Sequence, residues 1–164
     1  MDEETFRRLY EGTAKGLRGY LRHVLGSPAL SDDIFQESYF RMLKAELPSN
    51  MDTVQQKNYL YKIATNLIRD HKTARMLEQL PVEHDLPAAS HHPEETRDVR
   101  EAFEQLKMKE RDLLWLAYVD GFRHDEIARI VSTTPASVRP MLARAREKLR
   151  SILTRRGFGG TDGQ

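Results

Sequence analysis

Apolar residues in the first 25 positions recur at steps of three and four, the spacing of one face of a helix. Gly26 follows this stripe directly, and glycine commonly ends helices. The pattern therefore predicts an amphipathic helix that stops at Gly26. Its apolar members are Phe6, Leu9, Tyr10, Leu17, Tyr20, Leu21, Val24 and Leu25.

Two more helices are predicted before residue 80. Ser31 is expected to cap the first of them, which runs to about Leu47. Asp32 and Asp33 would then lie in its first turn, where carboxylates are stabilised by the helix dipole. The second is expected from about residue 54 to 74. One of its faces would carry Leu60, Ile63, Ala64, Leu67 and His71.

Residues 80–95, "LPVEHDLPAASHHPEE", interrupt this pattern with three prolines and no apolar period. Such composition is typical of a flexible or extended linker. Beyond it, one helix is marked by Val99, Ala102, Phe103 and Leu106. The nearly apolar segment "RDLLWLAYV" is expected to be the next helix and the core of a second domain. No stretch alternates with a period of two, so no sheet is expected.

The predicted fold is therefore all-α, with two small helical domains joined by a flexible linker. The expected divisions are a domain at 1–79, a linker at 80–96, a domain at 97–156 and a flexible tail at 157–164. Within the second domain, Gly121 ends one helix before "HDEIARIV" begins another. "STT" then forms a short turn, and Pro135 suits the first position of the last helix. This arrangement predicts a helix-turn-helix, which places its second helix in the major groove of DNA.

Pro140 lies inside that last helix, where it removes the hydrogen bond to the Ala136 carbonyl and crowds it. The helix is therefore expected to bend or to be interrupted at Arg139–Pro140. An alternative is that the long helix restarts at Pro140, with Arg139 extended before it. In both cases the arginines from position 144 onward keep their places.

Composition narrows the possible functions. The chain has 164 residues, no cysteine and no apolar run approaching a membrane span, so a soluble cytoplasmic protein is expected. Its net charge of +1 conceals an uneven distribution, with +7 over residues 129–156 and −3 over residues 101–128. A basic segment after a helix-turn pattern favours a polyanion partner. A helical hairpin with a solvated basic face is the plainer alternative.

The N-terminal domain carries two segments of opposite character. "KNYLYKIATNLIRDHKTAR" contains five basic residues, one acid, Tyr59 and Tyr61. Basic residues interleaved with aromatics suit single-stranded nucleic acid, although the tyrosines could simply pack in a core. "SDDIFQESYFRML" instead has an acidic and polar face, which suits a protein partner better than DNA.

Together, these segments resemble the extracytoplasmic-function (group IV) RNA polymerase sigma factors, from about residue 6 to 153. "DDIFQESYFRML" is similar to the family segment that binds the β′ clamp helices of RNA polymerase. The resemblance implies that role for Asp32, Asp33, Gln36, Glu37 and Arg41. "YLYKIATNLIRDHKTAR" is similar to the segment that melts and reads the minus-ten promoter element. There the resemblance implicates Tyr59, Lys62, Asn66, Arg69, Asp70, Lys72 and Arg75.

The helix-turn-helix is similar to the family's minus-thirty-five module. The resemblance implies base-edge contacts for the N-terminal residues of its last helix and phosphate contacts for the later arginines. The first group is Thr134, Ala136, Ser137 and Arg139, and the second is Arg144 and Arg146. The implied partners are core RNA polymerase, through its β′ clamp helices and β flap, promoter DNA and an anti-sigma factor. The chain departs from the family pattern at Tyr59, Lys107, Arg123, Ser132 and Pro140, where tryptophan, proline, serine, glycine and a small polar or basic residue are common. Four of these five lie in the C-terminal domain.

Two other classes of function remain open. A sigma-factor mimic would keep the acidic face and lose DNA contacts, whereas a helix-turn-helix regulator would not need that face. An enzyme is not expected. The six histidines form no metal-ligand or acid–base spacing, His91 and His92 lie in the linker, and no glycine-rich phosphate loop occurs. We therefore expect no catalytic residue, metal or cofactor.

Overall fold

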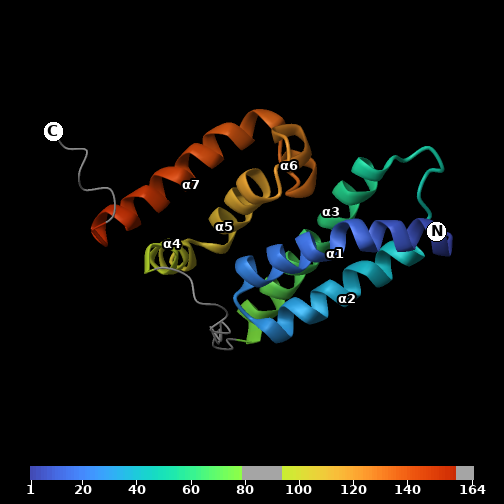
Figure 1. Ribbon diagram of the computed structural model, residues 1–164, viewed down its shortest axis with the longest axis horizontal. Helices are drawn as coiled ribbons and strands as arrows, with labels where there is room; N and C mark the ends of the chain where they lie inside the picture. The colour runs from blue at the N-terminus through green and yellow to red at the C-terminus, as the bar shows by residue number, and fades with distance from the viewer. Residues whose placement is uncertain (79–93, 158–164) are drawn as a thin grey trace.

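The computed structural model describes the backbone of residues 1–78 and 94–157 and the side chains of residues 1–71 and 97–157. Within these ranges the chain is helical and contains no strand, as predicted. Helices α1 (Glu3–Leu25), α2 (Pro28–Lys44) and α3 (Thr53–Glu78) pack together as an N-terminal module. Helices α4 (Glu94–Glu104), α5 (Met108–Leu114), α6 (His124–Ile130) and α7 (Pro135–Arg155) form a C-terminal module (Figure 1). Much of the expected linker, residues 79–93, lies outside the described residues, as does the tail from 158.

Helix α1 follows the sequence prediction closely. Asp2 caps it by accepting a hydrogen bond of 2.8 Å from the Thr5 amide. Gly26 ends it in the left-handed conformation, with φ of 70°, which glycine adopts without steric cost. Six of the eight predicted apolar residues are buried; Phe6 is partly buried and Tyr10 is 39% exposed.

The predicted cap of α2 is wrong. The helix begins at Pro28, and Ser27 caps it by accepting a 3.3 Å hydrogen bond from the Leu30 amide. Ser31 instead lies inside the helix and is buried. As a result, Asp32 and Asp33 lie beyond the first turn, which contains no acid. Proline at the first helical position was the sequence signal for the true start.

Helix α3 begins at Thr53, after a reciprocal cap in which Asp52 and Gln55 each bond the other's backbone amide, at 2.7 and 2.9 Å. It then runs without interruption to Glu78. Leu60 and Ala64 on the predicted face are buried, whereas His71 is exposed.

The apolar segment after Leu113 is only partly a core helix. Following α5, the chain widens into a π-helical turn, η1 (Trp115–Val119), in which the Asp120 amide bonds the Trp115 carbonyl at 3.0 Å. Leu113, Leu114 and Leu116 are buried, but Tyr118 and Val119 are 57% and 59% exposed. The expectation that this whole segment forms core therefore fails at its last two residues.

The helix-turn-helix is present. The turn between α6 and α7 includes Ser132, which has a positive φ of 57°, and this explains why glycine is common there in the family. Pro135 occupies the first turn of α7, and Thr134 precedes it. The chain remains helical through Pro140, so the predicted interruption and the predicted restart at this proline are both wrong. The missing hydrogen bond falls on the exposed side of the helix, where water can reach the Ala136 carbonyl.

The two modules pack against each other. Helix α3 lies on α6, and α1 lies on α5 and η1 (Figure 1). Tyr61 of α3 is fully buried and meets the Phe122 ring edge-on, with 5.0 Å between the ring centroids. His23 of α1 stacks on Trp115, at a centroid distance of 4.3 Å. No helix in the described part of the chain is long and apolar enough to cross a membrane.

Candidate functional site

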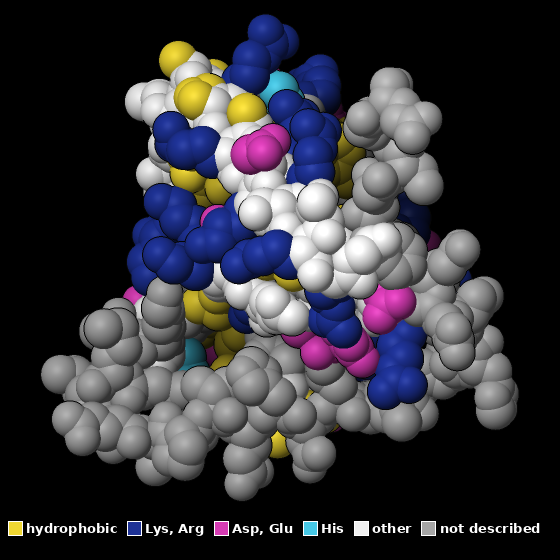
Figure 2. Space-filling view, turned by 90° about the vertical axis from the view of Figure 1, so that its left-hand side faces the viewer, with side chains coloured by type: hydrophobic (Ala, Val, Ile, Leu, Met, Phe, Trp, Pro, Cys, Tyr) yellow, Lys and Arg dark blue, Asp and Glu magenta, His cyan; other side chains and the backbone are white. Residues whose placement is uncertain are grey.

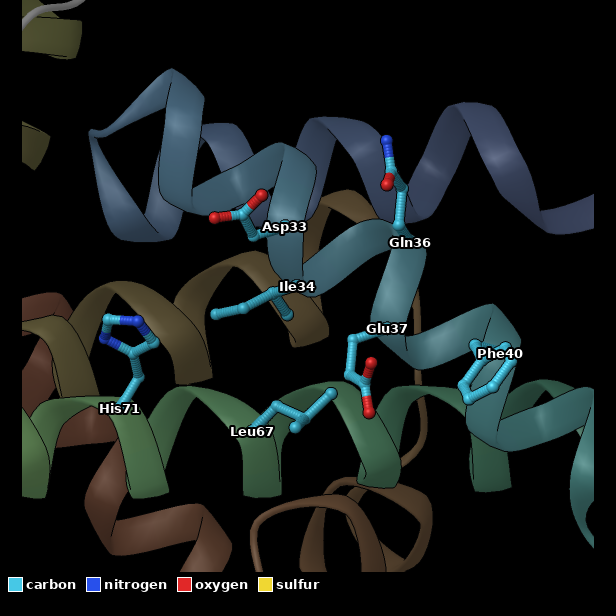
Figure 3. Close-up of a pocket in the computed structure, with 7 residues that line it drawn as sticks. All are labelled: Asp33, Ile34, Gln36, Glu37, Phe40, Leu67 and His71. Carbon is cyan, nitrogen blue, oxygen red and sulfur yellow. The ribbon is translucent and has the colours of Figure 1, made fainter.

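Three of the five predicted protein-binding residues, Asp33, Gln36 and Glu37, border an open groove of about 660 Å³ between α2 and α3, whereas Asp32 and Arg41 lie outside its lining. Figure 3 shows Asp33, Ile34 and Glu37 of α2 on one side, with Leu67 and His71 of α3 on the other. Gln36 and Phe40 also line the groove, and Gln36 points away from α3 in this view. The groove combines an apolar floor with an acidic rim, a surface suited to a protein that carries positive charge.

The five predicted residues of α2 remain accessible. Asp32, Asp33, Gln36 and Arg41 are exposed, and Glu37 is half-buried. Arg41 donates to the Glu37 carboxylate at 2.9 Å, and Arg18 of α1 lies 4.0 Å from Asp32. Both pairs are surface contacts of small energetic value, so another protein can replace them at little cost.

Two apolar residues of this surface were missed by sequence reasoning. Phe40 and Leu43 are 51% and 43% exposed, and the Lys44 ammonium lies 4.2 Å from the Phe40 ring centroid. Both residues fall outside the buried stripe of α2, which is the signal that could have revealed them. Exposed large apolar side chains beside a groove are typical of an interaction site.

The predicted minus-ten residues follow α3. Tyr59, 38% exposed, and the exposed Lys62 and Asp70 share one side of the helix with the half-buried Asn66. Lys72 and Arg75 lie on the same helix, and their side chains are outside the described residues. Tyr61 is not available to stack on a base, because it is buried between Tyr20 and Phe122. For Tyr61, the core-packing alternative is therefore correct.

Arg69, the remaining minus-ten candidate, is engaged with the C-terminal module. Its guanidinium donates to the Val131 carbonyl in the helix-turn-helix, at 3.2 Å. Nearby, Asn58 of α3 donates to the buried Glu126 carboxylate of α6, at 2.9 Å. Glu126 also accepts from the Arg123 amide at 2.9 Å, which is the glutamate half of a capping box at the start of α6.

The predicted minus-thirty-five residues lie at the start and along the outer side of α7. Thr134, Ala136 and Arg139 are exposed, and Ser137 is half-buried, with its hydroxyl 2.7 Å from that of Thr134. Arg144 and Arg146 are also exposed, and Arg146 donates to the Tyr118 hydroxyl. Figure 2 faces α4 and the C-terminal end of α7, rather than the start of that helix, and shows Lys and Arg side chains gathered on that part of the surface. The acidic groove between α2 and α3 belongs to the other module.

Two aspartates at the junction of the modules were not singled out by the sequence. Asp112 of α5 accepts a hydrogen bond from Tyr20 of α1, and burial raises its pKa to about 6, against the opposing effects of that bond and of Arg69. Burial likewise raises the pKa of Asp120 to about 6, against the opposing effects of Lys57 and Tyr61. The same surroundings hold the pKa values of Tyr20 and Tyr61 above their ordinary values, chiefly through burial.

No group of three or more His, Asp or Glu side chains within the described ranges could hold a metal ion. The candidate surfaces are the acidic groove, one side of α3 and the basic side of α7.

Family comparisons match both modules, in order along the chain. Residues 9–77 match the family "Sigma-70 region 2", and residues 96–149 match the family "Sigma-70, region 4". The chain is 25% identical over 158 residues to the RNA polymerase sigma factor CarQ of Myxococcus xanthus, covering 92% of this chain and 90% of that one. It is 28% identical over 128 residues to the RNA polymerase sigma factor SigV of Bacillus subtilis, covering 75% of each.

A solved structure shares the fold. The sigma factor RpoE of Bartonella quintana, crystallised with the anti-sigma factor NepR, superposes with a TM-score of 0.73 at 18% identity. The superposition covers 92% of this chain and 98% of the other. At that identity, the likeness concerns the fold.

Proposed function

Because the chain belongs to the extracytoplasmic-function group of the sigma-70 family, whose members are transcription initiation factors, we propose that it directs core RNA polymerase to specific promoters. In this proposal the N-terminal module binds polymerase and reads the minus-ten element, and the C-terminal module reads the minus-thirty-five element. The observation that carries it is that the acidic groove lies on the N-terminal module and the exposed arginines of α7 lie on the C-terminal module.

The groove is the proposed polymerase site. Asp32, Asp33, Gln36, Glu37 and Arg41 would contact a basic helical surface of polymerase, which the family resemblance identifies as the β′ clamp helices. The exposed Phe40 and Leu43 would add apolar area at its edge. Burial of such side chains contributes most of the energy in protein interfaces, while surrounding charges set specificity and association rate.

The minus-ten site is the side of α3 that carries Tyr59, Lys62, Asn66, Arg69 and Asp70, continued by Lys72 and Arg75. We expect it to bind the single-stranded, non-template strand, with Tyr59 stacking on a base and the cations following the backbone. The half-buried Asn66 and the exposed Arg69 would lie closest to the bases.

The minus-thirty-five site is the first turns of α7. Thr134, Ala136, Ser137 and Arg139 would approach base edges in the major groove, and Arg144 and Arg146 would contact phosphates. The β flap of polymerase would bind this module as well. An anti-sigma factor is a proposed further partner, because the structurally similar RpoE was crystallised with one.

The test of polymerase binding is the double change Asp33→Ala with Gln36→Ala. It should weaken binding to core polymerase roughly tenfold, or about 1.4 kcal/mol. Thermal stability should stay within about 1 kcal/mol of that of the parent, since both side chains are exposed. A pull-down titration measures the affinity, and Glu11→Gln on the exposed side of α1 is the matched control. Unchanged affinity in the double variant would remove the groove from the polymerase interface.

A further inference from the structure

The junction between the two modules is held by polar groups as well as by apolar packing. Four hydrogen-bonded contacts cross it: Tyr20 to Asp112, Asn58 to Glu126, Arg69 to the Val131 carbonyl, and Arg111 to the Val24 carbonyl at 2.9 and 3.1 Å. The Val24 carbonyl lies at the end of α1, where helix carbonyls lack partners within the helix. Each contact would break if the modules separated.

Two of the groups at this junction are carboxyls that face the opposite module. Asp112 accepts a hydrogen bond from Tyr20, whose hydroxyl also lies 3.3 Å from that of Thr65. The positive charge of Arg69 also acts on the Asp112 carboxyl. Tyr20, Thr65 and Arg69 all belong to the N-terminal module.

Asp120 lies at the same junction without such a bond: among the described residues, neither its Oδ2 atom nor the Tyr61 hydroxyl has a hydrogen-bond partner. Lys57 and Tyr61 of α3 both act on its carboxyl, and a Cβ atom placed on Gly16 of α1 would lie 3.9 Å from its Oδ1 atom. Tyr61 is itself buried. Two other titratable groups at the junction are His23, which stacks on Trp115, and Glu126, which Asn58 and the Arg123 amide bond.

Separation of the modules would return Asp112 and Asp120 to water. Closing them therefore strips water from two carboxyls, which costs more when the carboxyls are charged than when they are protonated. Closing also engages Arg69, a member of the proposed minus-ten surface, with the helix-turn-helix. The protonation of two aspartates is thus linked to the availability of a promoter-reading residue.

We propose that the Tyr20–Asp112 pair, together with the Asp120 carboxyl at the same junction, forms an acid-strengthened clasp that holds the two modules together and keeps Arg69 on the C-terminal module. The regulatory consequence rests on the proposed function of α3, whereas the clasp itself does not. Acidification tightens the closed form, and a rise in pH favours the open form in which both promoter-reading surfaces can act.

The direction of the effect follows from proton linkage. Each carboxyl has a pKa of about 6 in the closed form and an ordinary value of 3.8 when exposed. The closed form is therefore most favoured below about pH 4, loses stability as the pH rises from about 4 to about 6, and changes little above that. Between pH 7.5 and pH 5.5, the ratio of closed to open molecules should rise about fourfold for each carboxyl and roughly fifteenfold for the pair.

The experiment measures the distance between the modules in the full chain. Because the sequence has no cysteine, Glu11→Cys on α1 and Glu147→Cys on α7 provide two unique positions for fluorescent labels. Energy transfer should increase as the pH falls from 7.5 to 5.5, without a change in helical content. The double variant Asp112→Asn with Asp120→Asn keeps an oxygen for the tyrosines but cannot ionise, so it should stay closed at both pH values.

The control is Glu46→Gln, an exposed acid between α2 and α3, which should leave the pH response unchanged. Two results would overturn the clasp: energy transfer in the parent that does not change with pH, or an aspartate-to-asparagine double variant that keeps the full pH response. Should that variant fail to fold, Tyr20→Phe provides a second test. Removal of the hydroxyl that bonds the ionised Asp112 carboxyl should shift the population toward the open form at pH 7.5, and an unchanged population contradicts the clasp.

The regulatory consequence has its own readout. Free double variant should bind single-stranded minus-ten DNA more weakly than the parent at pH 7.5. Equal binding, combined with the expected distance changes, would retain the clasp and reject its effect on Arg69. Failure of the parent chain to support transcription with core polymerase would reject the proposed function, and leave the distance result unaffected.

Discussion

At the scale of single residues, the two glycines in α1 differ in their surroundings. Nothing lies within 4 Å of a Cβ atom placed on Gly12, whereas one placed on Gly16 would be 3.2 Å from the Tyr61 hydroxyl. Gly12→Ala should raise the free energy of unfolding by about 0.5–1 kcal/mol through helix propensity. Gly16→Ala should not show that gain, because the buried Tyr61 must shift. Its free energy of unfolding should be about 1 kcal/mol lower than that of Gly12→Ala. Urea denaturation of both variants measures the difference, and equal gains would show that the junction is loosely packed.

Lys72 and Asn66 should divide the work of minus-ten binding. Lys72→Ala removes one phosphate contact. The slope of the logarithm of the binding constant against the logarithm of salt concentration should therefore become shallower by about 0.7, with sequence preference unchanged. Asn66→Ala should instead relax the preference at one base. Both are measured in the polymerase holoenzyme on single-stranded minus-ten DNA. A changed sequence preference in Lys72→Ala would show that this lysine reads a base.

Individual residues also show where sequence reasoning stops. Accessibility of Asp33 and Gln36 followed from the apolar spacing around them, since a helix buries one stripe. The pairing of Tyr20 with Asp112 could not be predicted, because these residues are 92 positions apart and meet only when the modules pack. The sequence left the burial of Tyr61 as one of two alternatives for the same reason, since Phe122 covers it from the other module.

At the scale of helices, Pro140 has a measurable cost. It leaves the Ala136 carbonyl without its helix partner while α7 stays continuous. Pro140→Ser should therefore raise the free energy of unfolding by about 1–3 kcal/mol. Pro135→Ser, at the start of the same helix, should change the free energy of unfolding by less than about 1 kcal/mol. At this position the backbone N–H has no hydrogen-bond partner within the helix, so the proline removes none.

Upstream DNA provides the functional readout for the same proline. If Pro140 alters the approach of Arg139 to the bases, then Pro140→Ser should sharpen discrimination between the cognate upstream element and scrambled DNA. Competition binding with holoenzyme measures this. A less stable Pro140→Ser protein without sharper discrimination would indicate that the fold already accommodates the proline.

The type and order of the helices were predictable, whereas details of their ends were not. The period of the apolar residues identified every long helix, and Gly26, Gly121 and Pro135 marked boundaries correctly. The start of α2 was missed because Ser31 is followed by Asp32 and Asp33, which suit a first helical turn, whereas Pro28 is the signal that marks Ser27 as the cap. The π-helical turn at Trp115 has no signal in the apolar period, since its residues are apolar on all sides.

At the scale of the whole molecule, three proposed binding surfaces are distributed over two modules in contact. The acidic groove opens between α2 and α3, and the basic side of α7 lies on the other module. This division was expected from the sequence, because the acids of "SDDIFQESYFRML" and the bases of residues 129–156 are segregated along the chain. The contact between the modules is the feature that the sequence could not reveal.

Transcription by core polymerase reconstituted with this chain tests the central claim most directly. Mapping of transcript 5′ ends on genomic DNA should reveal starts downstream of a shared pair of minus-ten and minus-thirty-five elements. These starts should be lost when Asp33→Ala is combined with Gln36→Ala. If the chain adds no starts to those of core polymerase alone, it is not an initiation factor, and the roles assigned to its three surfaces are wrong.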